Sequence, residues 1–337
     1  MPEAVAYQLK NIRHYYENTC ALNVDELQIA KGSITGLIGP NGSGKTTLLK
    51  LLAFAMPPSC GDIFYNGKKE GCFSPVVRSK ITLLTQKPYL LKRSVFENIA
   101  YGLKIRKDCR NLDSRIRTAL AYVGLDHAQF AQRKWHQLSG GEAQRVAMAA
   151  RLILKPEVLL LDEPVASVDT QSARLIRTAS LNARDQWGTT LVIASHDLQW
   201  LYSISDSQLS ISNGNIFATG IENIIPGPFE ETREKTVIKK LEDGQILTLK
   251  KPENKKNTAM IKKDCLRIKE DNGSDNQLSG QIISMLAGEK SSHVLTHICV
   301  QELSFTLKLV PDQICRMNLY PGKNIVLQFD STDVEWI

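Results

Sequence analysis

The stretch 39–47 constrains the fold of this chain more than any other part of the sequence. It reads GPNGSGKTT and matches the pattern G-x-x-x-x-G-K-[ST]. Its glycines allow successive backbone N–H groups to point at one anion, Lys45 adds a cation, and the hydroxyl of Thr46 can ligate Mg²⁺. An apolar run at 33–38 precedes it and a helical run at 47–52 follows, which is the setting this motif requires. The sequence therefore predicts a phosphate-binding loop in an α/β fold.

Two carboxylates follow another apolar run. Residues 158–161 read VLLL, and Asp162 and Glu163 come directly after them. In sheets of this kind, ligand sites lie at the carboxyl ends of the strands. There Asp162 can hold Mg²⁺, and Glu163 can act as a general base on a water molecule aimed at a phosphate. The alternative is an ordinary solvated turn, but the phosphate loop upstream favours the catalytic interpretation.

Two further polar residues follow runs that predict buried strands. His196 comes after 190–195, and Gln86 comes after 81–85. At that edge of the sheet a histidine can donate a hydrogen bond to a terminal phosphate, and a glutamine can reach a metal ion. Each signal is weak when taken alone, because a single histidine is more often a surface or core residue.

Residues 94–155 show apolar residues at helical spacing, which predicts an inserted helical subdomain. The run LSGGE at 138–142 opens its last helix, expected over 143–154. We expect Ser139 to cap this helix, with Glu142 completing a capping box. A helix that begins at glycines also exposes backbone N–H groups to an anion, so capping and anion binding are compatible.

Composition narrows the class of protein. The chain has 337 residues, of which 42% are hydrophobic and 23% charged, as in a globular protein of two or three domains. No apolar run reaches the ~18 residues of a membrane span, and the N-terminus lacks a secretory pattern, so we expect a cytosolic protein. Its net charge of +7 is too mild to predict a nucleic-acid partner. The seven cysteines form no C-x-x-C pair, so they predict no zinc or redox site.

These motifs, taken in order, resemble those of ATP-binding cassette (ABC) proteins over about residues 5–222. LSGGE is the most specific of them, because this family alone combines it with a phosphate loop. The resemblance implies a P-loop NTPase domain, with a mixed sheet plus a helical subdomain, that hydrolyses ATP with the help of Mg²⁺. It rests on 39–47, Gln86, 138–142, 158–163, Ser167-Val168-Asp169 and His196.

The resemblance also implies a role for each site residue. Tyr16, or else its neighbour Tyr15, stacks on adenine, although an ordinary strand-end aromatic is the alternative from the residues alone. Glu163 is the catalytic base and His196 the sensor of the γ-phosphate. The implied nucleotide-binding residues are Tyr16, Asn41, Gly42, Ser43, Gly44, Lys45, Thr46, Thr47 and Gln86. The implied Mg²⁺ ligands are Thr46, Gln86 and Asp162.

The remaining motif residues are implied to act in trans. In this family two cassettes sandwich two ATP molecules, and the LSGGE run of each caps the nucleotide of the other, while Asp169 lies at the dimer seam. The implied partners are a second copy of the chain, a transmembrane permease subunit and an extracytoplasmic substrate-binding protein, with this chain peripheral at the cytoplasmic face of the membrane. Val168 replaces the leucine of many members, which is a conservative change. The in-trans residues are Ser139, Gly140, Gly141 and Glu142.

Three stretches, 89–103, 133–138 and 195–201, are similar to the ATPases of tungstate importers, with molybdate as the close second. Other importer cassettes, for sulfate, iron or polyamines, are the alternatives within transport. A soluble cassette protein acting on ribosomes or DNA is the alternative outside it. Such proteins usually carry two cassettes or a long coiled coil, and this chain has one phosphate loop and no long heptad run.

The C-terminal third predicts a second domain. We expect the cassette to span 1–225, with its helical subdomain at about 90–155, and 226–277 to form a linker and the start of an accessory β domain. Alternating runs from 278 to 337 predict a small barrel of about five strands, similar to the molybdate-binding-type (TOBE/Mop-like) barrels of oxyanion importer ATPases. Oxyanion binding that regulates transport and a plain dimerisation or spacer role are equally compatible with this tail.

Overall fold

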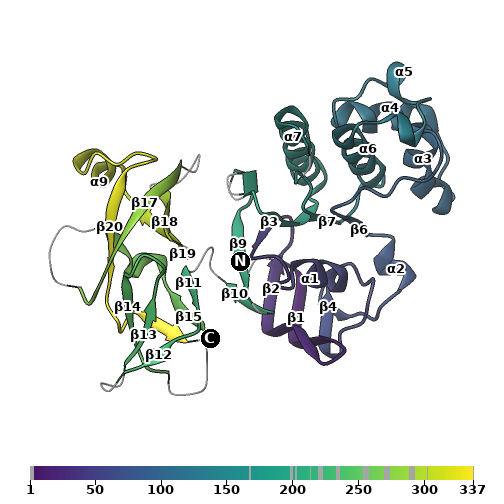
Figure 1. Ribbon diagram of the computed structural model, residues 1–337. Helices are drawn as coiled ribbons and strands as arrows, with labels where there is room; N and C mark the ends of the chain where they lie inside the picture. The colour runs from purple at the N-terminus through teal and green to yellow at the C-terminus, as the bar shows by residue number, and fades with distance from the viewer. Residues whose placement is uncertain are drawn as a thin grey trace. The chain divides into compact units, whose positions relative to one another are not determined.

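The computed structural model divides the chain into two compact units, Met1–Gly220 and Ile221–Ile337, which we call unit 1 and unit 2 (Figure 1). No helix in the described part of the chain combines the length and the apolar character needed to cross a membrane. The structure describes residues 4–166, 168–197, 200–201, 203–212, 214–218, 223–232, 236–252, 258–268, 274–287, 293–301 and 303–336.

Unit 1 is built on a ten-stranded mixed sheet, which confirms the predicted α/β class. The strand order is β5-β4-β1-β2-β10-β9-β3-β8-β7-β6. β3, β6, β7 and β8 pair in parallel, and every residue of β7 and β8 is buried. Burial on both faces explains why these strands read as continuous apolar runs. The strands are β1 Val5–Tyr16, β2 Thr19–Ala30, β3 Ile34–Ile38, β4 Cys60–Tyr65, β5 Lys68–Lys69, β6 Ile81–Leu84, β7 Val158–Asp162, β8 Thr190–Ala194, β9 Ser207–Ser212 and β10 Asn215–Ala218.

Most of the longer helices of unit 1 lie in one group. In Figure 1, α3, α4, α5 and α6 lie together, away from strands β1, β2 and β4, and α7 lies beside α6. Apolar side chains such as Ile99, Leu120 and Val146 hold this group to the core. The helices are α1 Lys45–Leu52, α2 Pro75–Arg78, α3 Val95–Ile105, α4 Leu112–Tyr122, α5 His127–Phe130, the 3-10 turn η1 Trp135–Gln137, α6 Gly140–Leu152 and α7 Thr170–Trp187.

The first strand, β1, extends to Tyr16. Its pairing with β2 passes an irregularity, at which His14 faces Leu22 and Tyr15 faces Cys20. The extra residue on β2, Ala21, marks a β-bulge, and a bulge of this kind re-aims the side chains that follow it.

The described part of unit 2 consists mainly of β-strands in three antiparallel sheets, ordered β11-β15-β21, β12-β13-β14 and β16-β20-β17-β18-β19. Phe305, Phe329, Leu278 and Leu327 are among the side chains buried in its core. The elements are β11 Asn223–Pro226, β12 Glu230–Glu231, β13 Thr236–Lys240, β14 Ile246–Lys250, β15 Thr258–Ile261, the 3-10 turn η2 Lys263–Cys265, β16 Arg267–Ile268, β17 Asn276–Ala287, β18 Val294–Val300, β19 Leu303–Leu309, α9 Pro311–Arg316, β20 Asn324–Phe329 and β21 Val334–Trp336.

The segment that we expected to be partly a linker, 226–277, contributes strands β12 to β16 to unit 2. Unit 2 therefore begins at Ile221, ahead of the predicted boundary after residue 225. Asn223 anchors this beginning. Its buried side-chain amide donates to the backbone oxygens of Ile261 and Thr306 and accepts from the N–H of Thr306. These bonds join the first strand of the unit to β15 and β19.

Candidate nucleotide-binding site

A hollow of about 630 Å³ in unit 1 gathers most of the predicted site residues. It lies where the phosphate loop meets the carboxyl ends of β6, β7 and β8, the edge at which sequence reasoning placed the site. All nine predicted nucleotide-binding residues line it, together with Asp162, Glu163 and His196. Its lining is Tyr16, Thr19, Cys20, Ala21, Asn41, Gly42, Ser43, Gly44, Lys45, Thr46, Thr47, Gln86, Asp162, Glu163, His196 and Gly214.

The phosphate loop depends on glycine where it meets β2. Gly44 precedes α1 with φ 113°, in a conformation that disfavours any other residue. A Cβ there would lie 2.6 Å from the carbonyl oxygen of Ala21. Gly214 also crowds Ala21, since its Cβ would lie 3.0 Å from the same carbonyl. The bulge residue of β2 therefore touches both the phosphate loop and the β9–β10 turn.

Lys45 is held inside its own loop. Its Nζ donates to the backbone oxygens of Gly39 at 2.7 Å and Pro40 at 3.0 Å. The side chain is buried, and burial lowers the pKa of the Lys45 ammonium, although the carboxylates of Glu163 and Asp162 oppose that shift. The carbonyl groups of the loop thus fix the position of this cation.

Thr46 and Asp162 form the oxygen pair that a divalent cation would need. The Thr46 hydroxyl donates to Asp162 Oδ2 at 2.9 Å, and Gln86 lines the same hollow. Burial raises the pKa of Asp162, while the hydrogen bond from Thr46 and the charge of Lys45 lower it. Proteins usually bind Mg²⁺ through one or two carboxylates and substrate phosphates, so this donor set fits the ion.

Glu163 is fixed in an unusual backbone conformation directly after β7. Its φ of 49° lies in the left-handed region, which is uncommon for a residue other than glycine and is concentrated at functional sites. Its N–H donates to the oxygen of Ala194 at 2.9 Å, and its Oε2 accepts from the backbone N–H of His196 at 3.1 Å. His196 Nε2 lies 3.1 Å from Glu163 Oε1. Burial raises the pKa of Glu163, although the hydrogen bond from His196 opposes the shift.

The structure distinguishes the two tyrosines that sequence reasoning left open. Tyr16 lines the hollow, whereas Tyr15 does not. The Tyr16 ring stands edge-on to the ring of His14, with centroids 4.9 Å apart, and its hydroxyl lies 3.8 Å from the sulfur of Met56. His14 is buried, and its ring nitrogens have no hydrogen-bond partner among the described residues. Of the two tyrosines, Tyr16 is therefore the one that faces the hollow.

Four lining residues escaped sequence reasoning: Thr19, Cys20, Ala21 and Gly214. The first three follow Tyr16 at the start of β2, and no motif marks them. Gly214 lies between β9 and β10, and no motif marks it either. The bulge at Ala21, which brings them together, has no sequence signature.

The LSGGE residues do not line this hollow within one chain. Ser139 caps α6, its Oγ accepting from the N–H of Glu142, and Glu142 Oε2 accepts from the N–H of Ser139 at 2.8 Å. Both halves of the expected capping box are thus present. Gly141 lies close to the start of α7, where a Cβ would be 3.0 Å from Ser172 Oγ and 3.1 Å from Asp169 Oδ2.

Asp169 caps α7 beside Gly141. Its Oδ1 accepts from the backbone N–H of Ser172, and its Oδ2 accepts from the Ser172 hydroxyl, each at 2.8 Å. These bonds lower the pKa of Asp169, so its carboxylate is charged. Ser167, the first residue of the predicted seam motif, lies outside the described residues. Within one chain, therefore, the LSGGE run and Asp169 form a cluster of their own, which we call the signature cluster.

Comparisons with known proteins agree with this site. The family model described as ABC transporter matches residues 22–166. The chain is 37% identical over 209 residues to a tungstate uptake system ATP-binding protein of Peptoclostridium acidaminophilum, covering 62% of this chain and 95% of that protein. It is 34% identical over 242 residues to a spermidine/putrescine import ATP-binding protein of Oleidesulfovibrio alaskensis, covering 72% of this chain and 64% of that protein.

A solved dimeric structure of a bacterial ABC transporter cassette superposes with a TM-score of 0.58 and 26% identity, covering 62% of this chain and 96% of that chain. The fold and the site thus define a P-loop ATPase of the cassette type. The chain belongs to the ABC transporter family of ATP-binding proteins, and it is an ABC-type ATPase.

Proposed function

We propose that this chain is the ATP-hydrolysing subunit of an ABC importer. It works as a homodimer attached to a transmembrane permease at the cytoplasmic face of the membrane. The observation that carries the proposal is the separation of the signature cluster from the nucleotide hollow within one chain. Residues of a family-specific motif that do not line the hollow of their own subunit are explained if they complete the site of a second copy.

Within the hollow each side chain has a distinct task. Lys45 and the N–H groups of 42–47 bind the phosphates, and Tyr16 stacks on adenine. Thr46, Asp162 and Gln86 would hold Mg²⁺, which neutralises phosphate charge as it develops. The raised pKa of Glu163 suits a general base, because it lies nearer to neutral pH than that of a solvated carboxylate.

His196 and Glu163 act as a pair. The backbone N–H of His196 holds one carboxylate oxygen, and its ring reaches the other. This arrangement orients Glu163 toward the attacking water while leaving the imidazole close enough to donate a hydrogen bond to the γ-phosphate. Thr46 and Asp162 would hold Mg²⁺ together only if the hydrogen bond between them were given up.

Closure of the dimer completes the mechanism. Ser139 and the N–H groups at the start of α6 cap the γ-phosphate of the partner, and Asp169 lies at the seam. ATP favours the closed dimer because it contacts both copies, and hydrolysis removes that preference. The permease converts this alternation into transport.

We propose tungstate as the cargo, delivered by an extracytoplasmic substrate-binding protein. The support is a 37% identical tungstate uptake relative of which the chain covers 95%. Molybdate is the next candidate, followed by sulfate, iron and polyamines. The spermidine/putrescine relative is of similar identity, which is why the cargo needs a direct test.

Disruption of the gene in its source cell provides that test, with accumulation of tungsten, molybdenum, iron and labelled spermidine measured together. We expect tungsten accumulation to fall and to be restored by the wild-type gene but not by the Lys45→Ala variant. If tungsten uptake is unchanged and uptake of another solute is lost, that solute, and not tungstate, is the cargo. If the uptake of none of these solutes falls, the importer assignment is contradicted and a soluble cassette protein is favoured.

For unit 2 we propose a regulatory role in which it binds the imported oxyanion and slows ATP hydrolysis. Tungstate should then inhibit the assembled transporter, and deletion of 230–337 should remove that inhibition. Equal inhibition of both forms would favour the dimerisation or spacer role for this unit.

A further inference from the structure

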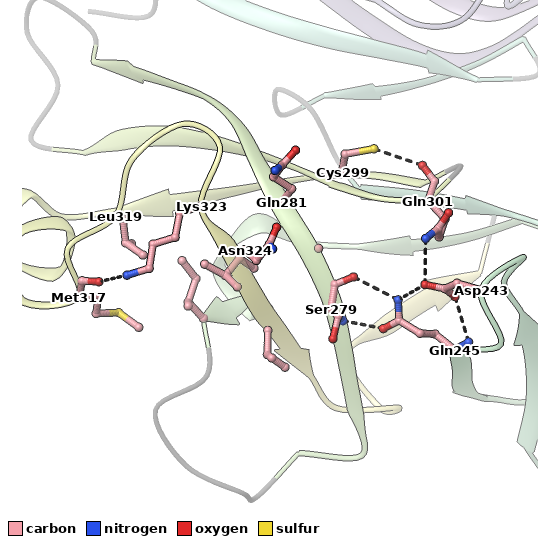
Figure 2. Close-up of a pocket in the computed structure, with 14 residues that line it drawn as sticks. Asp243, Gln245, Ser279, Gln281, Cys299, Gln301, Met317, Leu319, Lys323 and Asn324 are labelled. Atoms are coloured by element: carbon pink, nitrogen blue, oxygen red, sulfur yellow. Dashed lines mark hydrogen bonds between the residues drawn. The ribbon is translucent and has the colours of Figure 1, made fainter.

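Unit 2 contains a hollow of about 810 Å³ that no step of the proposed ATPase cycle uses. It lies against the five-stranded sheet, between the β13–β14 turn at one end and the segment after α9 at the other. Figure 2 shows Asp243 and Gln245 at the first end and Met317, Leu319 and Lys323 at the second. We call it the amide groove, after the four side-chain amides of Gln245, Gln281, Gln301 and Asn324 that line it.

The middle of the amide groove is a row across three neighbouring strands. Asn324 on β20 faces Gln281 on β17, and Gln281 faces Cys299 on β18. Directly opposed residues of antiparallel strands share a face of the sheet, so these three side chains stand side by side. Ser279, two residues before Gln281, continues the same face toward Asp243.

Asp243 supplies a permanent negative charge at one end. Its Oδ1 accepts from the backbone N–H of Gln245, and its Oδ2 accepts from the side-chain amides of Gln245 at 2.6 Å and Gln301 at 2.9 Å. These hydrogen bonds lower the pKa of Asp243, so the carboxylate stays ionised at neutral pH. The network is drawn in Figure 2.

The hydrogen bonds also fix which way the amides point. Gln301 donates its Nε2 to Asp243, and Gln281 donates its Nε2 to the backbone oxygen of Gly322 at 3.0 Å. Because both acceptors require a donor, neither amide can be flipped. The side-chain oxygens of Gln281 and Gln301, and both side-chain polar atoms of Asn324, keep no partner among the described residues. The groove therefore offers mainly acceptors.

Among the described residues that line the groove, Lys323 is the one cation, and its ammonium already has hydrogen-bond partners. Lys323 Nζ donates to the backbone oxygens of Met317 at 2.6 Å and Asn318 at 3.0 Å, which closes the loop that carries it. An oxyanion in the groove would thus meet a carboxylate and amide oxygens without a counter-charge aimed at it. An oxyanion site of unit 2 would have to lie outside the amide groove.

The rest of the lining is apolar. Ile268, Leu319 and Ile325 are nearly buried, and Met317 lies beside them. A surface that combines a carboxylate, outward-facing amide oxygens and an aliphatic floor matches a solute with the complementary parts. Such a solute has ammonium N–H donors and a short methylene chain.

We propose that the amide groove binds a small aliphatic ammonium compound, with an amine on Asp243 and Gln301 and its methylene chain on the apolar floor. The proposal goes beyond the ATPase function and does not depend on which cargo is transported. It assigns unit 2 a ligand of opposite charge to an oxyanion.

Titration calorimetry on the full chain tests this, with 1,4-diaminobutane, n-butylamine and sodium tungstate as probes at neutral pH and physiological salt. We expect saturable binding of the diamine. The monoamine should bind more weakly, because it lacks a second ammonium for the remaining amide oxygens. Asp243→Asn should weaken diamine binding by about tenfold, the size of one charge-assisted hydrogen bond. Glu242→Gln removes a neighbouring exposed carboxylate outside the lining and should change it less than about twofold.

Gln281→Leu is a second variant, chosen because it leaves the Asp243 turn intact. It should weaken diamine binding severalfold. The melting temperatures of the Asp243→Asn and Gln281→Leu variants are compared with that of the wild type to show that unit 2 is folded. If 1,4-diaminobutane shows no saturable binding up to about 10 mM, any binding is weaker than a specific site would give, and the proposal is overturned. So would equal binding by all four proteins, or saturation of the groove by tungstate. Addition of ATP should leave the diamine affinity unchanged, since a change would place the amine in the nucleotide hollow instead.

Discussion

The two hollows of this protein are built on opposite principles. In unit 1 the charged groups are buried: Lys45 is 6% exposed, and Asp162 and Glu163 are each 5% exposed. In unit 2 the charged group of the amide groove, Asp243, is exposed at a turn. Burial shifts the pKa values of the unit 1 groups toward their neutral forms, whereas hydrogen bonds shift that of Asp243 toward its charged form.

This difference indicates what each site gains from a ligand. Burial of the charges in unit 1 costs free energy, and we expect a nucleotide bound with Mg²⁺ to offset part of that cost. The amide groove is solvated and carries no such cost. We therefore expect substitutions in unit 1 to have large effects on chemistry, and substitutions in unit 2 to have smaller effects on affinity.

The largest effect is expected for Glu163→Gln. Loss of the general base should reduce ATP turnover by about 10²–10⁴-fold, while ATP binding survives and an ATP-bound dimer accumulates. Phosphate release measures the turnover, and size-exclusion chromatography with ATP measures the dimer. Turnover within a fewfold of wild type would show that Glu163 is not the base.

Ser139→Arg should come next, with turnover reduced by about 10²-fold or more, as expected when a phosphate-binding contact is blocked. ATP affinity of the isolated subunit should stay unchanged, because Ser139 does not line the hollow of its own chain. Ser139→Thr keeps the hydroxyl and serves as the matched control. A weaker ATP affinity in the Arg variant would contradict the in-trans role.

A pair of core substitutions tests whether the two units unfold independently of each other. Leu160→Ala in unit 1 and Leu327→Ala in unit 2 each remove a fully buried side chain. Each should cost about 2–5 kcal/mol of unfolding free energy, confined to its own unit. Hydrogen exchange of the full chain reports this unit by unit. Equal loss of protection in both units for either variant would show that they unfold together.

A smaller effect is expected at the adenine position. Tyr16→Ala should weaken ATP binding by about tenfold, the scale of an aromatic contact, whereas Tyr15→Ala should leave it within about twofold. His14→Leu should give an intermediate loss of affinity without a change in kcat at saturating ATP, since it supports the Tyr16 ring from its edge. Fluorescent nucleotide titration measures all three, and equal effects at positions 15 and 16 would contradict the assignment.

The smallest effect concerns stability and pH. The pKa of Asp162 is raised by burial, so the folded protein holds that proton more tightly than the unfolded chain does. The stability associated with this group is present below its ordinary pKa of 3.8 and is lost as pH rises through the raised value. Asp162→Asn should therefore melt a few degrees above wild type at pH 8 without nucleotide, and the difference should vanish in acid. A lower melting temperature at pH 8 would mean that Lys45 depends on this carboxylate.

Most of the unit 1 site was predictable because its chemistry lies on short contiguous stretches at strand ends. The loop 39–47 and the pair Asp162 and Glu163 need only a parallel sheet to bring them together. The choice between Tyr15 and Tyr16 was not predictable, because it depends on a bulge at Ala21 that one strand does not reveal. The contacts of Gly44 and Gly214 with Ala21 also form only in the folded chain, so the sequence does not reveal them.

Unit 2 was harder for a physical reason. Its long strands, such as β17 and β18, showed the alternation that a half-buried strand requires. Its short ones did not: β12 is two exposed glutamates, and β16 is two residues long. The amide groove collects side chains from several such elements, and four amides scattered over eighty residues carry no pattern that a sequence reader would connect.

The helix-capping role of Ser139 limits which residues can occupy this position. Serine, aspartate and asparagine cap helices about equally well, so stability alone would let them exchange freely. A hydroxyl can accept from the N–H of Glu142 and donate its own hydrogen to a phosphate at the same time, which a carboxylate cannot do. Aspartate at this position would cap the helix as well, but its charge would repel the phosphates that we propose Ser139 contacts in the partner copy. The proposed in-trans contact therefore excludes a residue that helix capping alone would allow.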